Sequence, residues 1–335
     1  MKLLITGGAG FVGSRLARTI LAKGQLNGKP IDSIVLADQF PAQPDLANNK
    51  KVTVMTGPLL TQCAEFAKTK WDGVFHLASA VSGECEADFD LGMRSNLEST
   101  RALLEALRSA GNIPRLFFSS SVAVFGPDPA HAFPHIVTDT TLPAPQTSYG
   151  SQKLMCEHLI ADYTRKGFID GRSARLMTVT VRPGKPNGAA SSFFSGIIRE
   201  PLAGEVSICP VDDTVAHPIA SPSKTVEGLI RVFEASRDEY VGRSALNLPA
   251  LNVTVAQMLK ALEDVAGPKV RALVQFKKDA RIAGIVDNWP RGATGDRAKA
   301  LGLMPDTDFK NVIRQYIADC QAAGLQSTAL KGLNQ

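Results

Sequence analysis

The sequence has no long hydrophobic run. None of its segments approaches the roughly 20 consecutive apolar residues that a membrane-spanning helix requires. The apolar run at the N-terminus is short and ends in glycines at Gly7, unlike the longer core and cleavage site of a secretory signal peptide. We therefore expect a cytoplasmic protein that makes no contact with a membrane.

Cysteines are few, odd in number and far apart, and no two of them form a paired spacing: Cys63, Cys85, Cys156, Cys209 and Cys320. Such a distribution argues for reduced thiols and against a disulfide framework or a zinc site. His131 and His135 are four residues apart, but they lie in a proline-rich stretch rather than on a helix. We expect no bound metal ion.

The sequence also lacks a basic block, because Lys and Arg occur in no cluster longer than a pair. Together with a small formal net charge of +5, this argues against a nucleic-acid partner. The mild positive balance suits an anionic cofactor and an anionic substrate. Hydrophobic residues at 44% and charged residues at 21% are ordinary for a globular protein.

The first half of the chain alternates short β-branched runs with helical patterns, which indicates a doubly wound parallel (Rossmann) α/β sheet. The helices are expected over residues 11–23, 93–107 and 152–166. The strands are expected over residues 2–6, 33–37, 52–55, 73–77, 115–119 and 176–181.

After Arg182-Pro183-Gly184 the sequence becomes richer in loops, with shorter elements over residues 225–236, 255–266 and 310–323. We therefore expect two domains. Residues 1–182 would form the nucleotide-binding domain, to which a later segment of about 212–236 returns. Residues 183–335 would form mainly a smaller C-terminal substrate-binding domain.

A glycine-rich turn, Gly7-Gly8-Ala9-Gly10, follows the first expected strand and leads into the first helix. Gly7 permits a tight turn, Gly10 lets the backbone approach a pyrophosphate, and Gly13 lets the helix pack closely on the strand. The free N–H groups and positive dipole end of the helix would face the phosphates. Because the motif lies in a strand–turn–helix context, it predicts a dinucleotide site.

Asp38 ends the second strand, 25 residues after Gly13. A carboxylate at this point accepts hydrogen bonds from the adenosine ribose hydroxyls and repels a 2′-phosphate. No arginine follows Asp38 directly, so the predicted cofactor is NAD rather than NADP.

Tyr149 and Lys153 are separated by one helical turn, so both project from one face of a helix. A tyrosine is a poor base at neutral pH, but a neighbouring ammonium favours the phenolate. The run Ser119-Ser120-Ser121 ends a strand at the carboxyl edge of the sheet, where a hydroxyl can hold the reacting oxygen. The pattern predicts acid–base catalysis.

These motifs resemble those of the extended short-chain dehydrogenases/reductases, a family that includes nucleotide-sugar epimerases. The resemblance rests on TGGAGFVG, FHLAS, FFSSSVAVFG, SYGSQK and VRPGKPNG, covers residues 1 to about 190, and continues more faintly beyond. It implies that Ser121, Tyr149 and Lys153 are catalytic. In that role Tyr149 deprotonates a secondary alcohol, hydride moves to the nicotinamide, and Lys153 binds the nicotinamide ribose.

The resemblance also implies a set of cofactor contacts, which comprises Gly7, Gly10, Phe11, Val12, Asp38, Ala78, Ser79 and Asn96, besides Tyr149 and Lys153. One departure is visible. The family often has Gly-Asp-Leu after the third strand, and this chain has Gly57-Pro58-Leu59, so only apolar packing by Leu59 is expected there.

The substrate is indicated by a second departure. The epimerases bind a diphosphate through arginines. One of these lies just before the strand that corresponds to Val215–Ala220 in this chain. This chain has Asp212-Asp213-Thr214 there, and Arg291 lies in a broken Arg-x-Gly-Asp motif. A nucleotide sugar is therefore disfavoured.

The run after the sixth strand, with Ser191 and Ser192, resembles the D-erythronate dehydrogenase branch, which oxidises the 2-hydroxyl of a four-carbon sugar acid with NAD. We expect Lys185 to meet the carboxylate of such an acid and Asn187 to bind its hydroxyls. The expected substrate contacts are Ser82, Ser121, Tyr149, Lys185 and Asn187.

Three alternatives stay open at this point: a nucleotide-sugar epimerase, a uronate dehydrogenase, and a redox-inactive NAD-binding regulator. The intact Ser/Tyr/Lys set argues against the regulator. The apolar stripe from Met93 to Leu107 and the helix after Lys153 predict a four-helix seam in a homodimer, as in the family, although core packing explains the stripes nearly as well.

Overall fold

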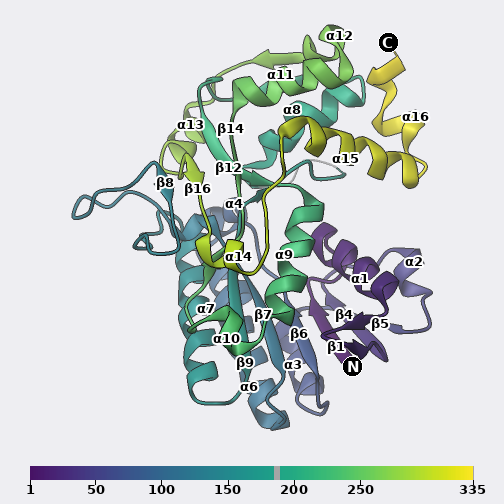
Figure 1. Cartoon of the computed structure of the whole chain (residues 1–335), viewed down its shortest axis with the longest axis vertical. Coiled ribbons are helices and arrows are strands. Elements are labelled where there is room, and N and C mark those ends of the chain that lie inside the picture. The colour runs from purple at the N-terminus through teal and green to yellow at the C-terminus, as the bar shows by residue number, and fades with distance from the viewer. Residues whose placement is uncertain (185–188, 335) are drawn as a thin grey trace.

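A computed structural model describes residues 1–184 and 189–334 and contains a seven-stranded parallel sheet (Figure 1). The strand order is β13-β9-β7-β6-β1-β4-β5. The chain adds strands in one direction from β1 to β5 and in the opposite direction from β6 onward, so the direction changes between β1 and β6, as in doubly wound nucleotide-binding folds. The strands are β1 (Lys2–Thr6), β4 (Ser33–Asp38), β5 (Val52–Thr56), β6 (Gly73–His76), β7 (Arg115–Ser121), β9 (Asp170–Leu176) and β13 (Leu246–Asn247).

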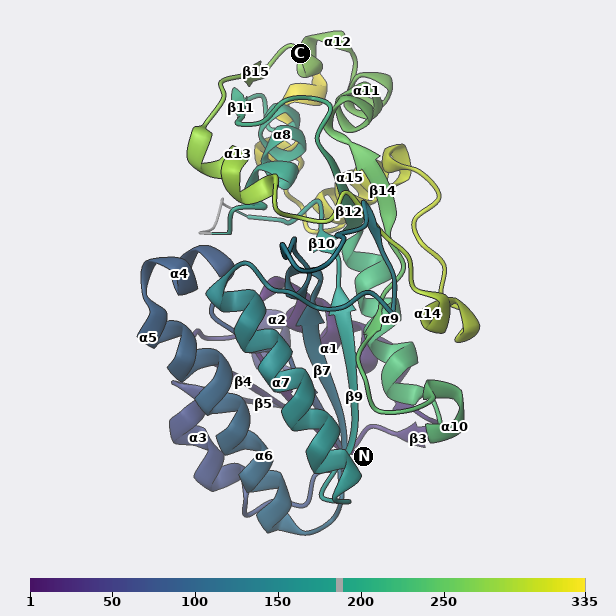
Figure 2. The ribbon, with the colours of Figure 1, turned by 90° about the vertical axis from the view of Figure 1, so that its left-hand side faces the viewer.

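Helices cover both faces of this sheet because the strands are apolar on both sides. Leu3 and Ile5 of β1 pack toward one face and Leu4 toward the other, and all three are fully buried. On the first face lie α1 (Phe11–Lys23) and α9 (Pro222–Glu234). On the second lie α3 (Leu59–Phe66), α6 (Ser99–Ala110) and α7 (Ser148–Arg165) (Figure 2).

A second lobe lies beyond the carboxyl ends of the parallel strands (Figures 1 and 2). Its main sheet orders β10, β12 and β14, and its own apolar core lies between helices α8, α11 and α15. These elements span β10 (Thr178–Val179), α8 (Ser192–Leu202), β12 (Ala216–Ala220), β14 (Leu251–Thr254), α11 (Val255–Ala266) and α15 (Phe309–Ala322).

The remaining strands form short pairs. They are β2 (Gln25–Leu26) with β3 (Lys29–Pro30), β11 (Ser207–Cys209) with β15 (Val274–Phe276), and β8 (Ile136–Val137) with β16 (Gly292–Ala293). The remaining helices are α2 (Pro44–Ala47), α4 (Ser82–Ala87), α5 (Phe89–Gly92), α10 (Arg237–Tyr240), α12 (Pro268–Arg271), α13 (Ala280–Val286), α14 (Asp296–Ala300), α16 (Gln326–Ala329), a π-helical turn (Met93–Glu98) and 3₁₀ turns at Val122–Val124 and Lys331–Asn334.

The chain returns to the first lobe after entering the second. Helix α9, strand β13 and helix α14 all contribute residues to the core that holds Leu3 and Ile5. Strand β12, which precedes α9, belongs instead to the three-stranded sheet of the second lobe. We keep the division at residue 182 as a proposal, in which the returning part begins at α9 and also includes β13 and α14.

One expected strand is wrong. A sheet strand was expected over residues 176–181, but the strand that joins the parallel sheet is β9, which ends at Leu176, whereas β10 pairs with β12 in the second lobe. The reason is chemical. Strand β9 carries two buried arginines, Arg172 and Arg175, whose polarity hides the strand from a hydrophobicity pattern. The Nε and Nη2 atoms of Arg172 both donate to the carbonyl of Ala235.

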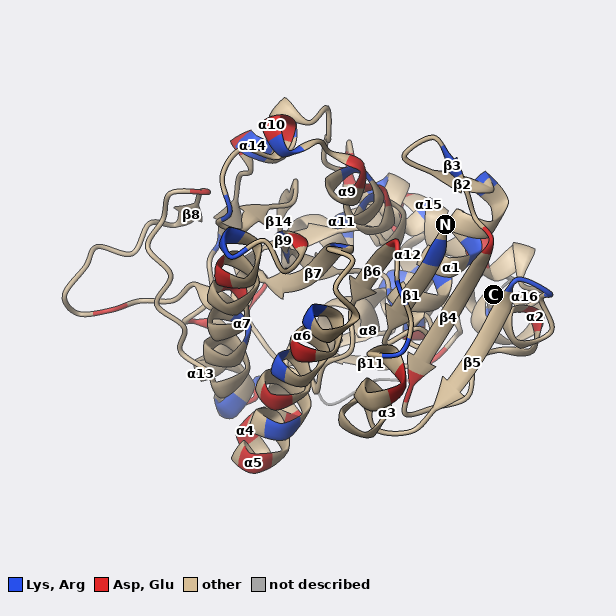
Figure 3. Cartoon of the chain, turned by 90° about the horizontal axis from the view of Figure 1, so that it is seen from below, with Lys and Arg blue, Asp and Glu red and all other residues tan. Residues whose placement is uncertain are grey.

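In residues 1–184 and 189–334, no helix is both long and apolar enough to span a bilayer. Positive and negative residues are interspersed along α6 and α7 in the view of Figure 3. The same described residues contain no group of three or more His, Cys, Asp or Glu side chains that could hold a metal ion.

Candidate active site

The glycine turn after β1 is packed so closely against its neighbours that Cβ atoms would not fit at several of its positions. Gly7 has a φ of +71°, and a Cβ atom there would lie 2.8 Å from the nitrogen of Ala78. A Cβ at Gly13 would lie only 2.1 Å from the carbonyl oxygen of Gly7, so α1 packs directly on the turn. A Cβ at Gly8 would lie 2.9 Å from Cβ of Leu36, so this glycine, to which the sequence pattern assigned no role, is also required by close packing.

This turn fits a pyrophosphate. The N-cap of α1 is Gly10, whose residue type supplies no capping side chain, so the first N–H groups of the helix remain available to an anion. Phe11 and Val12 form the first turn of α1, and both are partly exposed. The absence of side chains and the free helix N-terminus together match the demands of a dinucleotide.

Asp38 lies beside the turn at the end of β4. Its Oδ2 accepts the N–H of Ala9 at 2.9 Å, and its Oδ1 accepts the N–H of Phe40 at 3.1 Å. These two bonds fix the carboxylate while each oxygen keeps a further lone pair for a ribose hydroxyl.

Leu59, the first residue of α3, packs partly buried against the core on the other face of the sheet.

The loop after β6 packs against the glycine turn and forms a second side of the predicted cofactor site. The N–H of Ala78 donates to Oγ1 of Thr6 at 3.3 Å. Asn96 is 3% exposed and supports this loop from behind, since its Oδ1 accepts the N–H of Ala80 at 2.8 Å and the hydroxyl of Ser79 at 2.9 Å. Asn96 therefore positions the loop that was expected to bind the cofactor.

The residues that the sequence predicts to be catalytic come from β7 and α7. Ser121 is the last residue of β7, and Tyr149 is the second residue of α7, which begins at Ser148 rather than at residue 152 because Thr147 caps it by accepting the N–H of Gly150 at 3.1 Å. A Cβ at Gly150 would lie 2.2 Å from the carbonyl oxygen of Ala123, so the start of α7 lies directly against the turn after Ser121.

The side chain of Ser121 lies close enough to Tyr149 to lower the pKa of its hydroxyl. Lys153 is 3% exposed, its Nζ lies 5.5 Å from the centroid of the Tyr149 ring, and it donates to the carbonyl of Ser119 at 2.8 Å. The three residues that the sequence pattern singled out therefore lie together at the carboxyl edge of the sheet.

Burial raises the pKa of Tyr149 to about 12, and the hydrogen bond from Ser121 and the charge of Arg182 oppose this shift. Burial also lowers the pKa of Lys153 to about 8. The helical spacing predicted that Lys153 is the cation that lowers the pKa of Tyr149. In the structure the cation that lowers the pKa of Tyr149 is Arg182, because Lys153, with a pKa of about 8, loses its own proton before Tyr149 does.

Arg182 is a functional candidate that the sequence argument missed. Its Nε donates to the carbonyl of Val179 and its Nη2 to the hydroxyl of Ser191, both at 3.0 Å. Its own N–H donates to Oγ of Ser195 at 3.0 Å, which ties the loop after β10 to α8. The only signal for it was the segment Arg182-Pro183-Gly184 after an expected strand, to which no role had been given.

The expected substrate contacts are described only in part. Ser82 is the first residue of α4 and is partly buried, whereas Lys185 and Asn187 lie outside the described residues. Asp212 is exposed and pairs with Lys278 at 2.7 Å. Arg291 is exposed, and its N–H donates to the carbonyl of His135 at 3.0 Å, beside the β8–β16 pair.

Comparison with known proteins adds to this geometry. Residues 3–239 match the NAD dependent epimerase/dehydratase family. The chain is 46% identical to D-erythronate dehydrogenase of Cupriavidus necator over 96% of this chain and 100% of that protein. It is 41% identical to D-erythronate dehydrogenase of Haemophilus influenzae over 95% and 99% of the two chains.

A solved structure is also similar. The chain superposes on a nucleoside-diphosphate-sugar epimerase from Agrobacterium tumefaciens with a TM-score of 0.90 and 38% identity, covering 97% of this chain and 96% of that one. The family match and the full-length relatives agree with two features of the structure, which are the glycine turn after β1 and the group formed by Ser121, Tyr149 and Lys153. The chain belongs to the NAD dependent epimerase/dehydratase family.

Proposed function

We propose that the chain is an NAD-dependent dehydrogenase that oxidises the 2-hydroxyl of D-erythronate to give 2-dehydro-D-erythronate. The observation that carries the proposal is the identity of 46% and 41% to two D-erythronate dehydrogenases over nearly the whole chain. The proximity of Ser121, Tyr149 and Lys153 at the carboxyl edge of the sheet supports it.

The residues of the site would act as follows. The turn at Gly7–Gly13 and the carboxylate of Asp38 hold NAD, which accepts a hydride from C2 when it is bound. Ser121 would hold the substrate hydroxyl. Tyr149, as the phenolate that the charge of Arg182 favours, would accept its proton, so the secondary alcohol becomes a ketone. Lys153 donates to the nicotinamide ribose. Water is kept from the reacting atoms by the burial that surrounds Lys153.

A 2-hydroxy acid has its carboxylate bonded directly to the carbon that is oxidised. The cation that binds the carboxylate must therefore lie within a few ångströms of the Tyr149 hydroxyl. We propose that Lys185 supplies this cation and that Asn187 and Ser82 bind the remaining hydroxyls. The charge of Arg182, which acts on Tyr149, makes the same part of the site favourable to an anion.

The proposal is tested by following NADH formation with D-erythronate, with five- and six-carbon aldonic acids, and with UDP-glucose. We expect the four-carbon acid to react fastest because the longer acids need a larger pocket. Lys185→Ala should lower the efficiency about tenfold to a hundredfold on the acid and little on its uncharged amide, since a charge-assisted contact contributes roughly 1.5–3 kcal/mol. Equal losses on both substrates would contradict a charge role for Lys185.

The structural relative named as a nucleoside-diphosphate-sugar epimerase favours a second candidate, an epimerase. Asp212 and Asp213 argue against it, because the first is an exposed carboxylate and both stand where a diphosphate would need a cation. Conversion of UDP-glucose without net NADH formation would favour the epimerase. A uronate dehydrogenase would instead oxidise a six-carbon uronic acid, and a regulator would bind NAD and oxidise none of these compounds.

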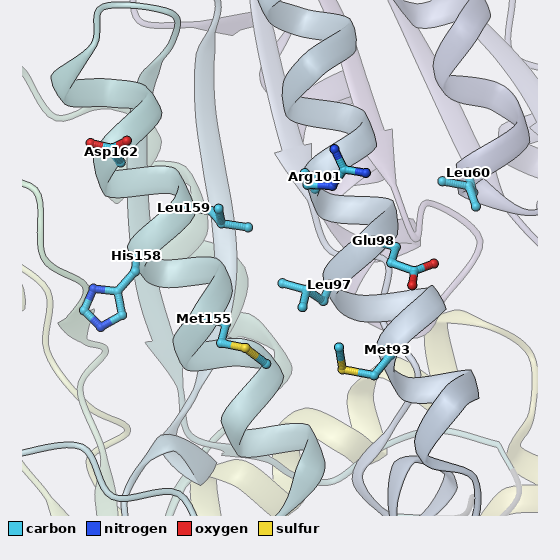
Figure 4. Close-up of a pocket in the computed structure, with 9 residues that line it drawn as sticks. All are labelled: Leu60, Met93, Leu97, Glu98, Arg101, Met155, His158, Leu159 and Asp162. Atoms are coloured by element: carbon cyan, nitrogen blue, oxygen red, sulfur yellow. The ribbon is translucent and has the colours of Figure 1, made fainter.

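We further propose that the enzyme is a cytoplasmic homodimer. An apolar groove runs between the π-helical turn with α6 on one side and α7 on the other, and Figure 4 shows Met93 and Leu97 facing Met155 and Leu159 across it. Met155 is 39% exposed, which is high for an apolar side chain between two helices. The same two helices of a second copy would cover this groove and form a four-helix seam.

A further inference from the structure

A buried ion pair lies directly beneath the catalytic residues. Glu157 of α7 and Arg175 of β9 are joined by two parallel bonds, Nε to Oε1 at 2.9 Å and Nη2 to Oε2 at 2.8 Å. Each of the two side chains is only 6% exposed. Such a bidentate pair fixes the relative position of its two elements as well as the charges.

The pair contacts the catalytic segment at two points. The hydroxyl of Ser120, the neighbour of Ser121, donates to Oε1 of Glu157. The guanidinium carbon of Arg175 lies 4.8 Å from the centroid of the Phe125 ring, just after the turn that follows Ser121. The strand end that bears the catalytic serine is therefore held from α7 and from β9 at once.

Glu157 is also one helical turn from Lys153, so the two side chains project from the same face of α7. Lys153 is buried and lies among several other titratable groups, which are Cys156 on α7, Cys85 on α4, His76 on β6 and Tyr149. Burial raises the pKa values of both thiols and lowers that of His76 to about 3, so at neutral pH these groups are uncharged. Within this set Glu157 is the carboxylate that opposes the loss of a proton from Lys153.

We propose that Glu157 and Arg175 are positioning residues for the dehydrogenation: the pair fixes the strand end that bears Ser121, and its balance of charge determines whether Lys153 is protonated. The proposal rests on the proposed function for the role of Lys153 in catalysis. It goes beyond that function because it assigns control of the protonation of Lys153 to two residues that are not among the proposed substrate or cofactor contacts.

The charge role makes a prediction that a structural role does not. Glu157→Gln removes the anion and leaves Arg175 unpaired, so the pKa of Lys153 should fall. Arg175→Met removes the cation and leaves Glu157 unpaired, so the pKa of Lys153 should rise. Each shift should be about one pH unit, the lower end of the effect of a nearby charge. The double variant removes both charges and should restore a value close to that of the wild type.

The experiment is a titration of the protein without cofactor or substrate, followed by NMR of lysine labelled with ¹³C at Cε. Lys153→Arg identifies the Lys153 signal by its loss. Ser120→Ala is the matched control, because it removes a hydrogen bond of the same cluster without changing a charge, and the pKa of Lys153 should stay at its wild-type value. The pH dependence of NADH formation should move with the titration in each variant.

Shifts in the same direction for Glu157→Gln and Arg175→Met, or no shift in either, would overturn the proposal. A buried charge without its partner is strongly destabilising, whereas a neutral replacement of both is often tolerated. If one of the single variants does not fold, the pKa of Lys153 in the other single variant is compared with its pKa in the double variant. The sign of that difference then tests the proposal. Because the titration needs no substrate, its result stands even if D-erythronate is not oxidised, so the two proposals fail separately.

Discussion

The N–H of Ala9 donates to Oδ2 of Asp38 at 2.9 Å, so the turn after β1 and the end of β4 form one unit. The carboxylate holds the glycine turn, and we propose that its charge also faces the adenosine ribose of the cofactor. Variants of Asp38 can separate these roles because an amide keeps the acceptor oxygen but not the charge.

For Asp38→Ala we expect NAD to bind about tenfold more weakly or worse, since a hydrogen bond to a charged group contributes roughly 1.5–3 kcal/mol. The preference for NAD over NADP should shrink as well, because the repulsion of a 2′-phosphate is lost. Titrations with both cofactors measure this. Asp38→Asn should lose the preference but keep one of the two backbone hydrogen bonds, since its amide has one acceptor oxygen. A wild type that already prefers NADP would contradict the role of Asp38.

Tyr149→Phe should keep NAD binding and lower turnover by roughly 10²–10⁴-fold, the usual contribution of a positioned acid–base group. Tyr163→Phe is the matched control, since Tyr163 lies on the same helix and its hydroxyl donates to Glu105, away from the site. Near-normal turnover of the Tyr149 variant in a steady-state assay would remove Tyr149 from the mechanism.

Gly13→Ala should abolish NAD binding, because its Cβ would lie 2.1 Å from the carbonyl oxygen of Gly7 and the turn would have to move. The expected loss of unfolding free energy is about 1–3 kcal/mol, as for overpacking elsewhere in protein cores. Calorimetric titration with NAD and urea unfolding measure the two effects. Gly284→Ala is the control, since a Cβ at Gly284 would meet no atom within 4 Å outside the backbone of its own helix. Equal effects of both variants would argue against the steric explanation.

Stability should decrease as the pH falls below the ordinary histidine range. His76 and His217 are 1% and 2% exposed, and burial lowers both pKa values to about 3. The unfolded chain, with ordinary histidine pKa values near 6.5, therefore binds more protons than the native state between about pH 6.5 and pH 3. Each histidine should decrease the unfolding free energy by up to about 1.4 kcal/mol per pH unit in this window.

Urea unfolding at several pH values in that range measures the slope. His131→Gln should leave it unchanged because His131 is exposed, whereas His217→Gln should remove one histidine's share. A stability that is independent of pH in this window would show that the two buried imidazoles do not stay neutral.

Met155→Asp should convert the proposed dimer to a monomer, since it introduces a charge into the apolar groove between the π-helical turn and α7. Light scattering coupled to gel filtration measures the mass. Leu142→Asp is a suitable control: Leu142 is 57% exposed and lies outside the groove. A wild type that is monomeric at micromolar concentration would contradict the dimer.

The sequence predicted the nucleotide-binding half well, because its signals are local. The strand Lys2–Thr6 and the helix Phe11–Lys23 were expected with their observed bounds, since glycines bound both elements and apolar residues fill them. The Tyr149–Lys153 spacing was readable for the same reason: four residues on a helix determine a shared face.

What the sequence could not predict depends on contacts between distant segments. Arg172 and Arg175 look like exposed residues until their partners, Ala235 and Glu157, are known. The effect of Arg182 on Tyr149 likewise arises only when the loop after β10 folds against α8. The roles of Lys185 and Asn187 remain predictions, because both residues lie outside the described parts of the chain.

The return of α9, β13 and α14 to the first lobe has a consequence during synthesis on the ribosome. When residue 182 has been made, β9 is still an edge strand that pairs only with β7, and the part of the sheet face that α9 covers is exposed. Completing that core through Leu303 requires about 120 further residues, roughly 6 to 24 seconds at typical elongation rates. The nascent chain therefore exposes apolar surface throughout this interval. During this time it depends most on chaperones to prevent aggregation.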